Sequence, residues 1–225
     1  SGLIESVAVL PGGNQNQDEV YFIVQRTVNG TAKRYLEKLA PVYYATKTDA
    51  YRLDSYITYS GAAAIPVSGL DHLEGETVLA WADGYYAGSY TVASGQIALE
   101  TAASNVVVGL DYDGLYKSSK LAFGAQQGTA LAQKGRPNKV AFMLRNAIAG
   151  GIEYGQNFTR MDRLKDRANS DPLDSGPALV TTTTDPLTIP GNHVSDPRLC
   201  IRMNAPYPGW IDGVVVGQEM NERVT

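Results

Sequence analysis

The stretch that decides the fold is residues 68–92, which read SGLDHLEGETVLAWADGYYAGSYTV. Glycines punctuate its first part, residues 68–78, and this pattern predicts a loop. Residues 77–82 and 85–92 carry the valines and tyrosines typical of strands, with Asp83-Gly84 between them. Because Asp-Gly is a preferred two-residue hairpin turn, the stretch predicts a loop that leads into a β-hairpin.

The composition extends this prediction to the whole chain. Of 225 residues, 44% are hydrophobic, and there are 23 glycines, 11 prolines and 14 tyrosines. Tyrosine favours pleated, half-buried surfaces, and glycine supplies the positive φ of tight turns. We therefore predict an all-β protein, whose length allows one large domain or two to three small ones.

Strand-like segments recur along the chain. The most regular are residues 19–28 and 33–39, which flank Asn29-Gly30, the preferred pair of a type I′ hairpin turn. The other candidate strands are residues 3–10, 51–59, 96–100, 105–110, 139–148, 178–183, 198–203 and 213–218. We expect loops at residues 12–18, 124–138, 169–177 and 185–197, and a short helical turn at 159–167.

These elements predict antiparallel sheets that form a β-sandwich-like body with a small inserted β-barrel. We expect three segments: a β-sheet segment at 1–67, the small inserted β-barrel at 68–112, and a C-terminal β-sandwich-like domain at 113–225. The start on a strand directly after Ser1-Gly2 favours an origin within a longer chain.

Charge and hydropathy exclude some classes of function. The formal net charge is -4 and the isoelectric point is near 5.2, so the chain lacks the general basic character of nucleic-acid-binding domains. The basic spot at Lys134, Arg136 and Lys139 is small. No apolar run approaches the roughly 18 residues of a membrane span, and no signal-peptide pattern occurs at the N-terminus.

A single cysteine, Cys200, lies in the alternating stretch 199–203. One cysteine allows no disulfide within the chain and no zinc site built on cysteine pairs. The pattern predicts a buried strand residue. The alternative, a nucleophilic thiol, requires His72 or His193 within reach, since these are the two histidines of the chain.

Four polar side chains gather in the sequence at residues 71–76. Asp71, His72, Glu74 and Glu76 are close enough along the chain to bind a metal ion or to pair carboxylates for acid and base catalysis. The alternative is that these side chains accept backbone hydrogen bonds at turns, as acidic residues in loops before strands often do. The sequence favours the second interpretation.

Two further groups allow a binding function or a structural one. The mixed-charge run of residues 160–167 predicts either a contact with a phosphate or partner, or a solvated face. The pairs Tyr43-Tyr44 and Tyr85-Tyr86 predict either a sugar-stacking surface or the covering of a sheet. Standard signatures of hydrolases, phosphate-binding loops, zinc proteases and dinucleotide enzymes are absent from the sequence. Their absence does not exclude an enzyme, but it leaves no residue set for a mechanism, so we assign no catalytic, cofactor-binding or metal-binding residues and expect a non-catalytic protein.

The chain resembles the C-terminal region of phage and prophage tail nozzle proteins, also called tail tubular protein B or stabilisation-like proteins. The most specific block is Ser68–Val78, which is similar to a small β-barrel labelled as a half-domain of ubiquitin-activating enzyme, and no ubiquitin chemistry follows from that. The other matching segments are Gly2–Val9 with Asp18-Glu19-Val20, Lys33–Leu39, Ala82-Asp83-Gly84, Val108–Leu110 with Tyr112, Gly128–Ala130, Lys139–Asn146, Ser170–Asp174, and Leu199–Met203 with Pro206 and Pro208.

The resemblance implies a structural role in the virion. The protein would be one subunit of a homo-oligomeric ring, expected to be a hexamer, that continues the tail tube below the adaptor protein and lets DNA pass as cargo. It would assemble in the bacterial cytoplasm, and a propeller-like region would precede these residues. The loops at 12–18, 124–138 and 185–197 would be candidates for gating the channel.

Two rival classes make different predictions. A receptor- or glycan-binding module would use exposed aromatic residues such as Tyr85, Tyr86, Tyr90 and Trp210. A hydrolase would bury a carboxylate pair, drawn from Asp71, Glu74, Asp111 and Asp113, about 5 to 10 Å apart in a cleft. A ring subunit would instead expose flat, partly apolar surfaces for head-to-tail contact.

Overall fold

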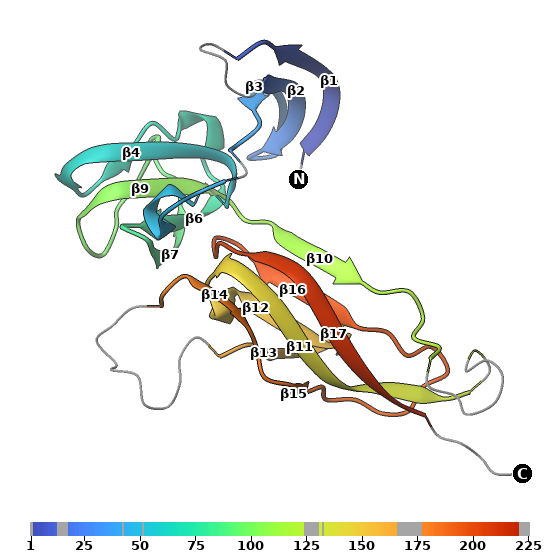
Figure 1. Cartoon of the computed structure of the whole chain (residues 1–225). Coiled ribbons are helices and arrows are strands. Elements are labelled where there is room, and N and C mark those ends of the chain that lie inside the picture. The colour runs from blue at the N-terminus through green and yellow to red at the C-terminus, as the bar shows by residue number, and fades with distance from the viewer. Residues whose placement is uncertain are drawn as a thin grey trace, which may run out of the picture. The chain divides into compact units, whose positions relative to one another are not determined.

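A computed structural model of the chain describes residues 2–12, 18–41, 43–50, 52–123, 131, 133–165 and 177–220 (Figure 1). Strands account for most of these residues. The helical elements among them are 3₁₀ turns of three residues, such as Asp71–Leu73. The predicted all-β fold is confirmed. The chain forms two compact units, residues 1–112 and 113–225, which we describe separately.

A three-stranded antiparallel sheet opens the first unit. It consists of β1 (Gly2–Leu10), β2 (Glu19–Val28) and β3 (Thr31–Lys38), in the order β1-β2-β3. Asn29 and Gly30 have φ values of 48° and 73°, which are the positive angles of a type I′ turn. The hairpin predicted around Asn29-Gly30 is therefore confirmed.

Two further sheets complete the first unit. One has the order β4-β9-β6-β7, and the other pairs β5 with β8. Their bounds are β4 (Asp54–Ala64), β5 (Val67–Ser68), β6 (Thr77–Ala82), β7 (Tyr85–Thr91), β8 (Gln96–Ile97) and β9 (Ala103–Leu110). Leu70 and Leu73, from the turn that precedes β6, pack with Val78 of β6 and with Val106 and Val108 of β9 in one buried cluster. The Asp83-Gly84 hairpin is confirmed, with φ values of 47° and 81°.

The small β-barrel expected at 68–112 is replaced by open sheets. In the described residues, the strands of this segment form an open four-stranded sheet with β4, which lies before residue 68, and a two-stranded sheet. β4 pairs with β9 through Ile57 and Val108, so strand pairing crosses the boundary expected between residues 67 and 68. The physical reason lies in β9, because its buried Val106–Val108 run needs a neighbouring strand on both edges.

The second unit is a β-sandwich of two four-stranded sheets. One sheet has the order β10-β16-β12-β13; in the other, β11 pairs with β14, β15 and β17. The bounds are β10 (Asp113–Lys117), β11 (Gly135–Ala147), β12 (Ile152–Asn157), β13 (Arg160–Arg163), β14 (Val180–Thr183), β15 (Leu187–Thr188), β16 (Cys200–Asn204) and β17 (Trp210–Met220). Phe142 and Leu144 of β11 pack with Ile152 of β12 and Ile201 of β16, so the core lies between the two sheets.

Some local expectations differ from the structure. The helical turn expected at 159–167 is wrong, because Arg160–Arg163 form β13 and pair with β12. The loop expected at 124–138 ends earlier, since β11 begins at Gly135, and the loop expected at 185–197 contains β15. Residues 124–130, 132, 166 and 167 of these expectations fall outside the described residues, as do most of the loops at 12–18 and 169–177, Tyr51 at the start of the strand expected at 51–59, and the matching blocks Gly128–Ala130 and Ser170–Asp174.

The helices found among the described residues are too short or too polar to cross a membrane.

The core of the second unit gives a first testable prediction. Phe142 is fully buried, whereas its neighbour Met143 is 45% exposed on the opposite face of β11. We expect Phe142→Ala to lower the free energy of unfolding of this unit by about 3–5 kcal/mol, because it leaves a cavity between the sheets. Hydrogen exchange of β11 and β16 peptides in increasing urea measures the change. The control Met143→Ala changes it by less than about 0.5 kcal/mol; equal losses in the two variants would contradict the assigned core.

Candidate functional site

The acidic residues of the stretch 71–76 bind backbone groups at turns. The Glu74 carboxylate accepts hydrogen bonds from the amides of Ser94 at 2.9 Å and Gly95 at 2.7 Å. The Glu76 carboxylate accepts one from the amide of Asn29 at 2.7 Å. The structural interpretation of these two glutamates is therefore confirmed. Across the described residues, no three His, Cys, Asp or Glu side chains lie close enough to hold a metal ion.

The local geometry requires glycine at the turn that Glu74 binds. Gly95 has a φ of 67°, and a Cβ atom at this position would lie 2.5 Å from the Asp71 carboxylate. A side chain at residue 95 would push Asp71 away and separate the turn from Glu74. The stretch 68–78 therefore ties together two hairpin turns, the one at Asn29-Gly30 and the one at Ser94-Gly95.

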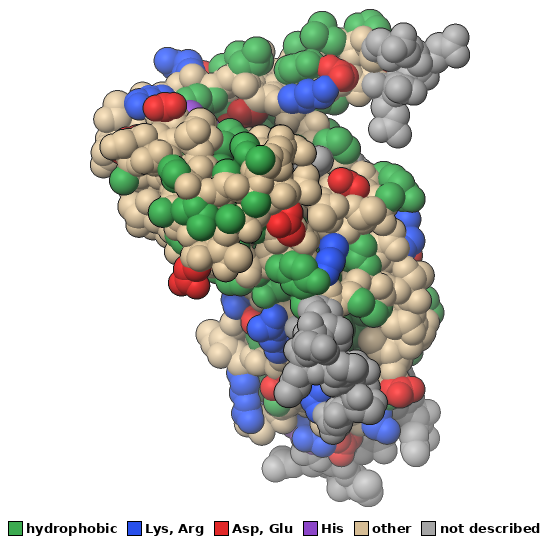
Figure 2. All heavy atoms as spheres, turned by 90° about the vertical axis from the view of Figure 1, so that its left-hand side faces the viewer, with side chains coloured by type: hydrophobic (Ala, Val, Ile, Leu, Met, Phe, Trp, Pro, Cys, Tyr) green, Lys and Arg blue, Asp and Glu red, His purple; other side chains and the backbone are tan. Residues whose placement is uncertain are grey.

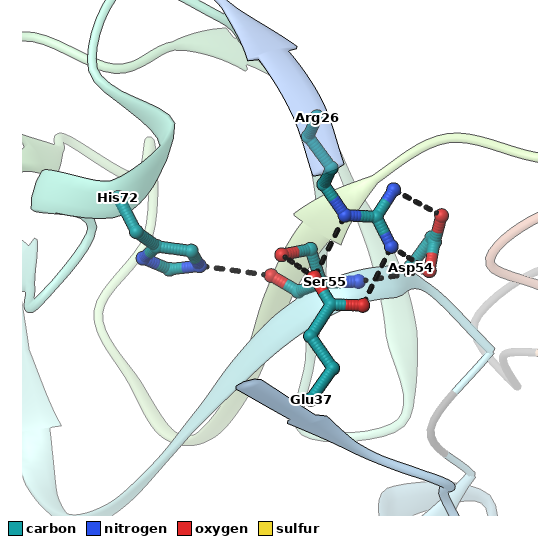
Figure 3. Close-up of polar contacts among 5 residues, drawn as sticks. All are labelled: Arg26, Glu37, Asp54, Ser55 and His72. Atoms are coloured by element: carbon teal, nitrogen blue, oxygen red, sulfur yellow. Dashed lines mark hydrogen bonds and ion pairs between the residues drawn. The ribbon is translucent and has the colours of Figure 1, made fainter. Parts of the chain in front are cut away.

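A buried arginine forms the most elaborate polar cluster of the first unit (Figure 3). Arg26 of β2 is 4% exposed. Its Nε and Nη2 atoms donate to the two Glu37 carboxylate oxygens, both at 2.7 Å. Its Nη1 and Nη2 atoms donate to the two Asp54 oxygens, both at 2.8 Å. Two bidentate ion pairs thus neutralise one guanidinium, which is the geometry that arginine forms most strongly with carboxylates.

Arg26 keeps its positive charge at any physiological pH. The hydrogen bonds of Glu37 raise the pKa of Arg26, and those of Asp54 add to this effect, while burial acts in the opposite direction. A guanidinium held in this way does not exchange protons with a substrate. Arg26 is therefore a fixed charge that positions its neighbours.

The same cluster joins two sheets. Glu37 belongs to β3, whereas Asp54 and Ser55 begin β4. The hydroxyl of Tyr35 on β3 donates to the His72 carbonyl at 3.0 Å, and the two rings meet edge to face. The hydrophobic cluster of the first unit draws its members from residues 57–110. The Arg26 cluster and the Tyr35 contact thus join the sheet β1-β2-β3 to the rest of the unit, beside the buried apolar side chains of Val24 and Val28 on β2.

The arrangement of Ser55, His72 and the carboxylates differs from a catalytic triad. His72 Nε2 lies 2.9 Å from the carbonyl oxygen of Ser55, not from its hydroxyl, and the Ser55 hydroxyl donates to Glu37 at 2.9 Å (Figure 3). A nucleophilic serine requires its hydroxyl to donate to the histidine base. These side chains therefore hold β3 and β4 together.

An open cleft of about 930 Å³ lies against this cluster. Its walls include the apolar side chains of Ile4, Phe22 and Leu39, and Arg26 and Glu37 lie among its polar residues. The charge of Arg26 is already balanced there by Glu37 and Asp54, whose two carboxylates exceed it by one formal negative charge. The cleft thus presents mainly apolar surface to an incoming group.

Arg26 was not identified as a candidate residue from the sequence. Its signal is the alternation of Val24, Arg26 and Val28, all buried on one face of β2. A single charged residue in such a run predicts a buried ion pair. The partners could not be identified in the same way, because Asp54 lies 28 residues further along the chain.

The other carboxylate candidates lie in different surroundings. Asp71 and Glu74 lie at the Ser94-Gly95 turn of the first unit. Asp113 belongs to the second unit, where its carboxylate is 3.5 Å from Arg202. No pair among these residues shares a described cleft, since none of them lines the cleft at Arg26. Asp71 and Glu74 share a turn, where the Glu74 carboxylate is bound to two backbone amides.

The aromatic candidates are engaged by neighbouring groups. Tyr85 and Tyr86 are about two-fifths exposed, but as successive residues of β7 they face opposite sides of the sheet. The Lys47 ammonium lies 3.5 Å from the centre of the Tyr85 ring, and Arg145 lies 5.0 Å from that of Trp210. The Tyr90 hydroxyl donates to the Ala87 carbonyl. These rings do not form a continuous stacking platform.

The pair Tyr43-Tyr44 is divided in the same way. Tyr43 is largely exposed, whereas Tyr44 is buried. The guanidinium of Arg52 lies 5.4 Å from the centre of the Tyr44 ring. The two rings therefore do not form one exposed surface.

Two candidates in the second unit are also structural. Cys200 is fully buried in β16, as the alternation predicted, and burial raises the pKa of its thiol, which opposes formation of a nucleophilic thiolate. In the mixed-charge run, Arg163 donates to the Gly150 carbonyl and packs near Tyr207. Residues 166 and 167 of that run lie outside the described residues.

Comparison with known proteins adds no family to these observations. No protein-family model matches the chain, and no curated protein matches it. The resemblance to tail nozzle proteins stays a prediction.

The Arg26 cluster generates a prediction about local stability. Arg26→Ala leaves two carboxylates without their cation. We expect this to lower the free energy of local opening of the sheet β1-β2-β3 by about 3 kcal/mol. The loss is at the lower end of the range for buried pairs because solvent screens the partly exposed Asp54 side chain. Amides of β2 and β3 then exchange about a hundredfold faster, while those of β6 and β9 keep their protection. Hydrogen exchange measures both.

Arg34→Ala is the matched control. Arg34 lies on β3 and also forms a two-bond pair with a glutamate, Glu5, but it is exposed. Removing the Arg34 side chain is expected to change the amide exchange rates of β2 and β3 by less than about fivefold, since a surface ion pair contributes about 1 kcal/mol or less to stability. Equal effects of the two substitutions would show that Arg26 does not join the sheets.

Proposed function

We propose that the protein is a structural, non-catalytic subunit of a short-tailed phage tail, and that it forms the nozzle or tail-tube ring through which DNA leaves the virion. Its partners in this role are other copies of itself and adjoining tail proteins such as the adaptor. DNA is passing cargo. The subunit is made in the bacterial cytoplasm and functions in the virion.

The exposure of β1 is the observation that carries the proposal. All nine residues of this strand are exposed, and five of them are large and apolar. The side chains of Leu3, Ile4, Val7, Val9 and Leu10 are each 53–64% exposed. Apolar strands of this kind, left in contact with water, are typical of surfaces that become covered on assembly. Figure 2 shows hydrophobic side chains in several separate patches on one face of the molecule.

The charge of the chain supports the same role. A channel for DNA must not bind phosphate strongly, and the net charge of -4 provides weak repulsion instead of attraction. A protein that reads DNA sequence would carry an excess of Lys and Arg on one face. The engagement of the aromatic rings by cations and backbone groups gives the glycan-binding alternative no comparable support.

Measuring the assembly state in solution tests the proposal. Light scattering of the whole chain, followed by negative-stain imaging, is expected to give a mass that is a multiple of 24.2 kDa and particles with a central opening. Closed rings are the expected outcome because head-to-tail contacts with the correct rotation close on themselves.

A tenfold dilution series is the control, because specific rings keep a fixed mass until they dissociate, whereas aggregates change mass continuously. A monomer that persists at high concentration would contradict the proposal. A screen of cell-surface glycans would then test the binding-module alternative.

A further inference from the structure

Two strands of the chain, β1 and β17, each have one edge without a strand partner among the described residues. Within the described residues, β1 pairs with β2 alone, so one of its edges carries backbone amides and carbonyls without a strand partner. Its register is regular over Ser6–Leu10, after a bulge between Ile4 and Ser6. Glu5 is the one charged residue of the strand, and it is bound by Arg34 of its own sheet at 2.6 Å.

The opposite edge of the same sheet is protected. β3 carries Lys33, Arg34 and Lys38. Arg34 and Lys38 are paired with Glu5 and Glu19 of the same sheet, so the charge that discourages pairing with another strand at this edge is mainly that of Lys33. Sheets that must remain single protect both edges, so the lack of such protection on β1 indicates an edge that is meant to be paired. The partner strand must also be apolar on both faces, since β1 exposes apolar side chains on both.

β17 provides such a strand. Among the described strands it pairs with β11 alone, and its central residues, Gly213–Val216, carry no charge. Val215 is 56% exposed, while Val214 and Val216 pack against the core from the other face. The flanking charges are neutralised within the sheet, Asp212 by Arg145 at 2.9 Å and Glu219 by Arg136 at 2.8 Å.

The charges of the two units favour contact between unlike surfaces. Residues 1–112 contain 6 Lys and Arg against 12 Asp and Glu, whereas residues 113–225 contain 13 against 11. The first unit is therefore acidic and the second slightly basic. Two first units repel each other, while a first unit attracts the second unit of another copy. This favours pairing of β1 with β17 of another copy over pairing of two β1 strands.

We infer that β1 of one copy pairs edge to edge with β17 of a second copy, so that the two sheets become continuous at the subunit interface. The inference rests on the proposed function, because it assigns the contact by which the ring forms. Backbone hydrogen bonds supply affinity, and the apolar side chains near Val7, Val9 and Val215 become covered. Each copy offers one β1 and one β17, so the contact is heterologous and propagates from copy to copy.

Two blocked variants test this contact. Val7→Lys with Val9→Lys places charge on the β1 edge, and Val215→Lys places it on β17. The matched controls are Leu36→Lys on β3 and Met143→Lys on the central strand β11, both at exposed positions. Hydrogen exchange of β2 and β11 establishes that each variant keeps its fold, and Val9→Lys alone replaces the double variant if that one unfolds.

Mixing the variants gives the decisive measurement. Each blocked variant alone is expected to be a monomer by light scattering, because no contact of this kind can form. The mixture is expected to contain dimers of one copy of each, since the β17 strand of the first variant and the β1 strand of the second are intact. The control variants assemble as the wild type does. A chain that combines Val7→Lys with Val215→Glu is expected to recover assembly.

The possible failures are distinguishable. If the wild type forms rings and the blocked variants form them too, the contact between β1 and β17 is overturned while the proposed function stands. If the β1 variant is monomeric but Val215→Lys assembles normally, two β1 strands pair instead, and the inference is also overturned. A wild type that stays monomeric at high concentration contradicts both the inference and the proposed function.

Discussion

The first unit depends on the burial of one guanidinium. Arg26 is removed from water on β2, and a buried cation is tolerated only where carboxylates surround it. Glu37 supplies one from the neighbouring strand, and Asp54 supplies the other from the start of β4. Satisfying this one charge therefore fixes where the sheet β1-β2-β3 meets the rest of the unit. The attachment runs through β2 and β3, and the apolar residues of β1 stay exposed.

The sequence predicted the local elements of this fold well. Asn29-Gly30 and Asp83-Gly84 form the two-residue turns expected of them, because the positive φ values of such turns are favoured by only a few residue types. The pairing of β4 with β9 was not predictable in this way. It joins residues about fifty positions apart, and it depends on the need of a buried valine run for strands on both sides. A barrel was expected at 68–112 instead of open sheets for the same reason, because the pairing of β4 with β9 could not be predicted from the sequence.

The candidate site shows a similar division. The carboxylates of Glu74 and Glu76 were correctly interpreted as turn ligands, since an acidic residue in a glycine-rich loop commonly accepts backbone hydrogen bonds. The more important charged residue, Arg26, attracts little notice in the sequence because one arginine in a strand is common. Its alternation with Val24 and Val28 was the available signal. Its partners Glu37 and Asp54 belong to a pairing that only the folded chain reveals.

The uncovered strand raises a question of specificity, since an apolar sheet edge pairs readily with many chains. The bulge between Ile4 and Ser6 twists β1 and leaves a short regular segment, Ser6–Leu10, for pairing. Glu5 is bound within the sheet by Arg34, so it does not repel a neighbour, and β3 closes the opposite edge with charge. One short edge is left open while the other is blocked. This asymmetry gives a contact that has a direction, and a direction is what distinguishes an ordered chain of subunits from an aggregate.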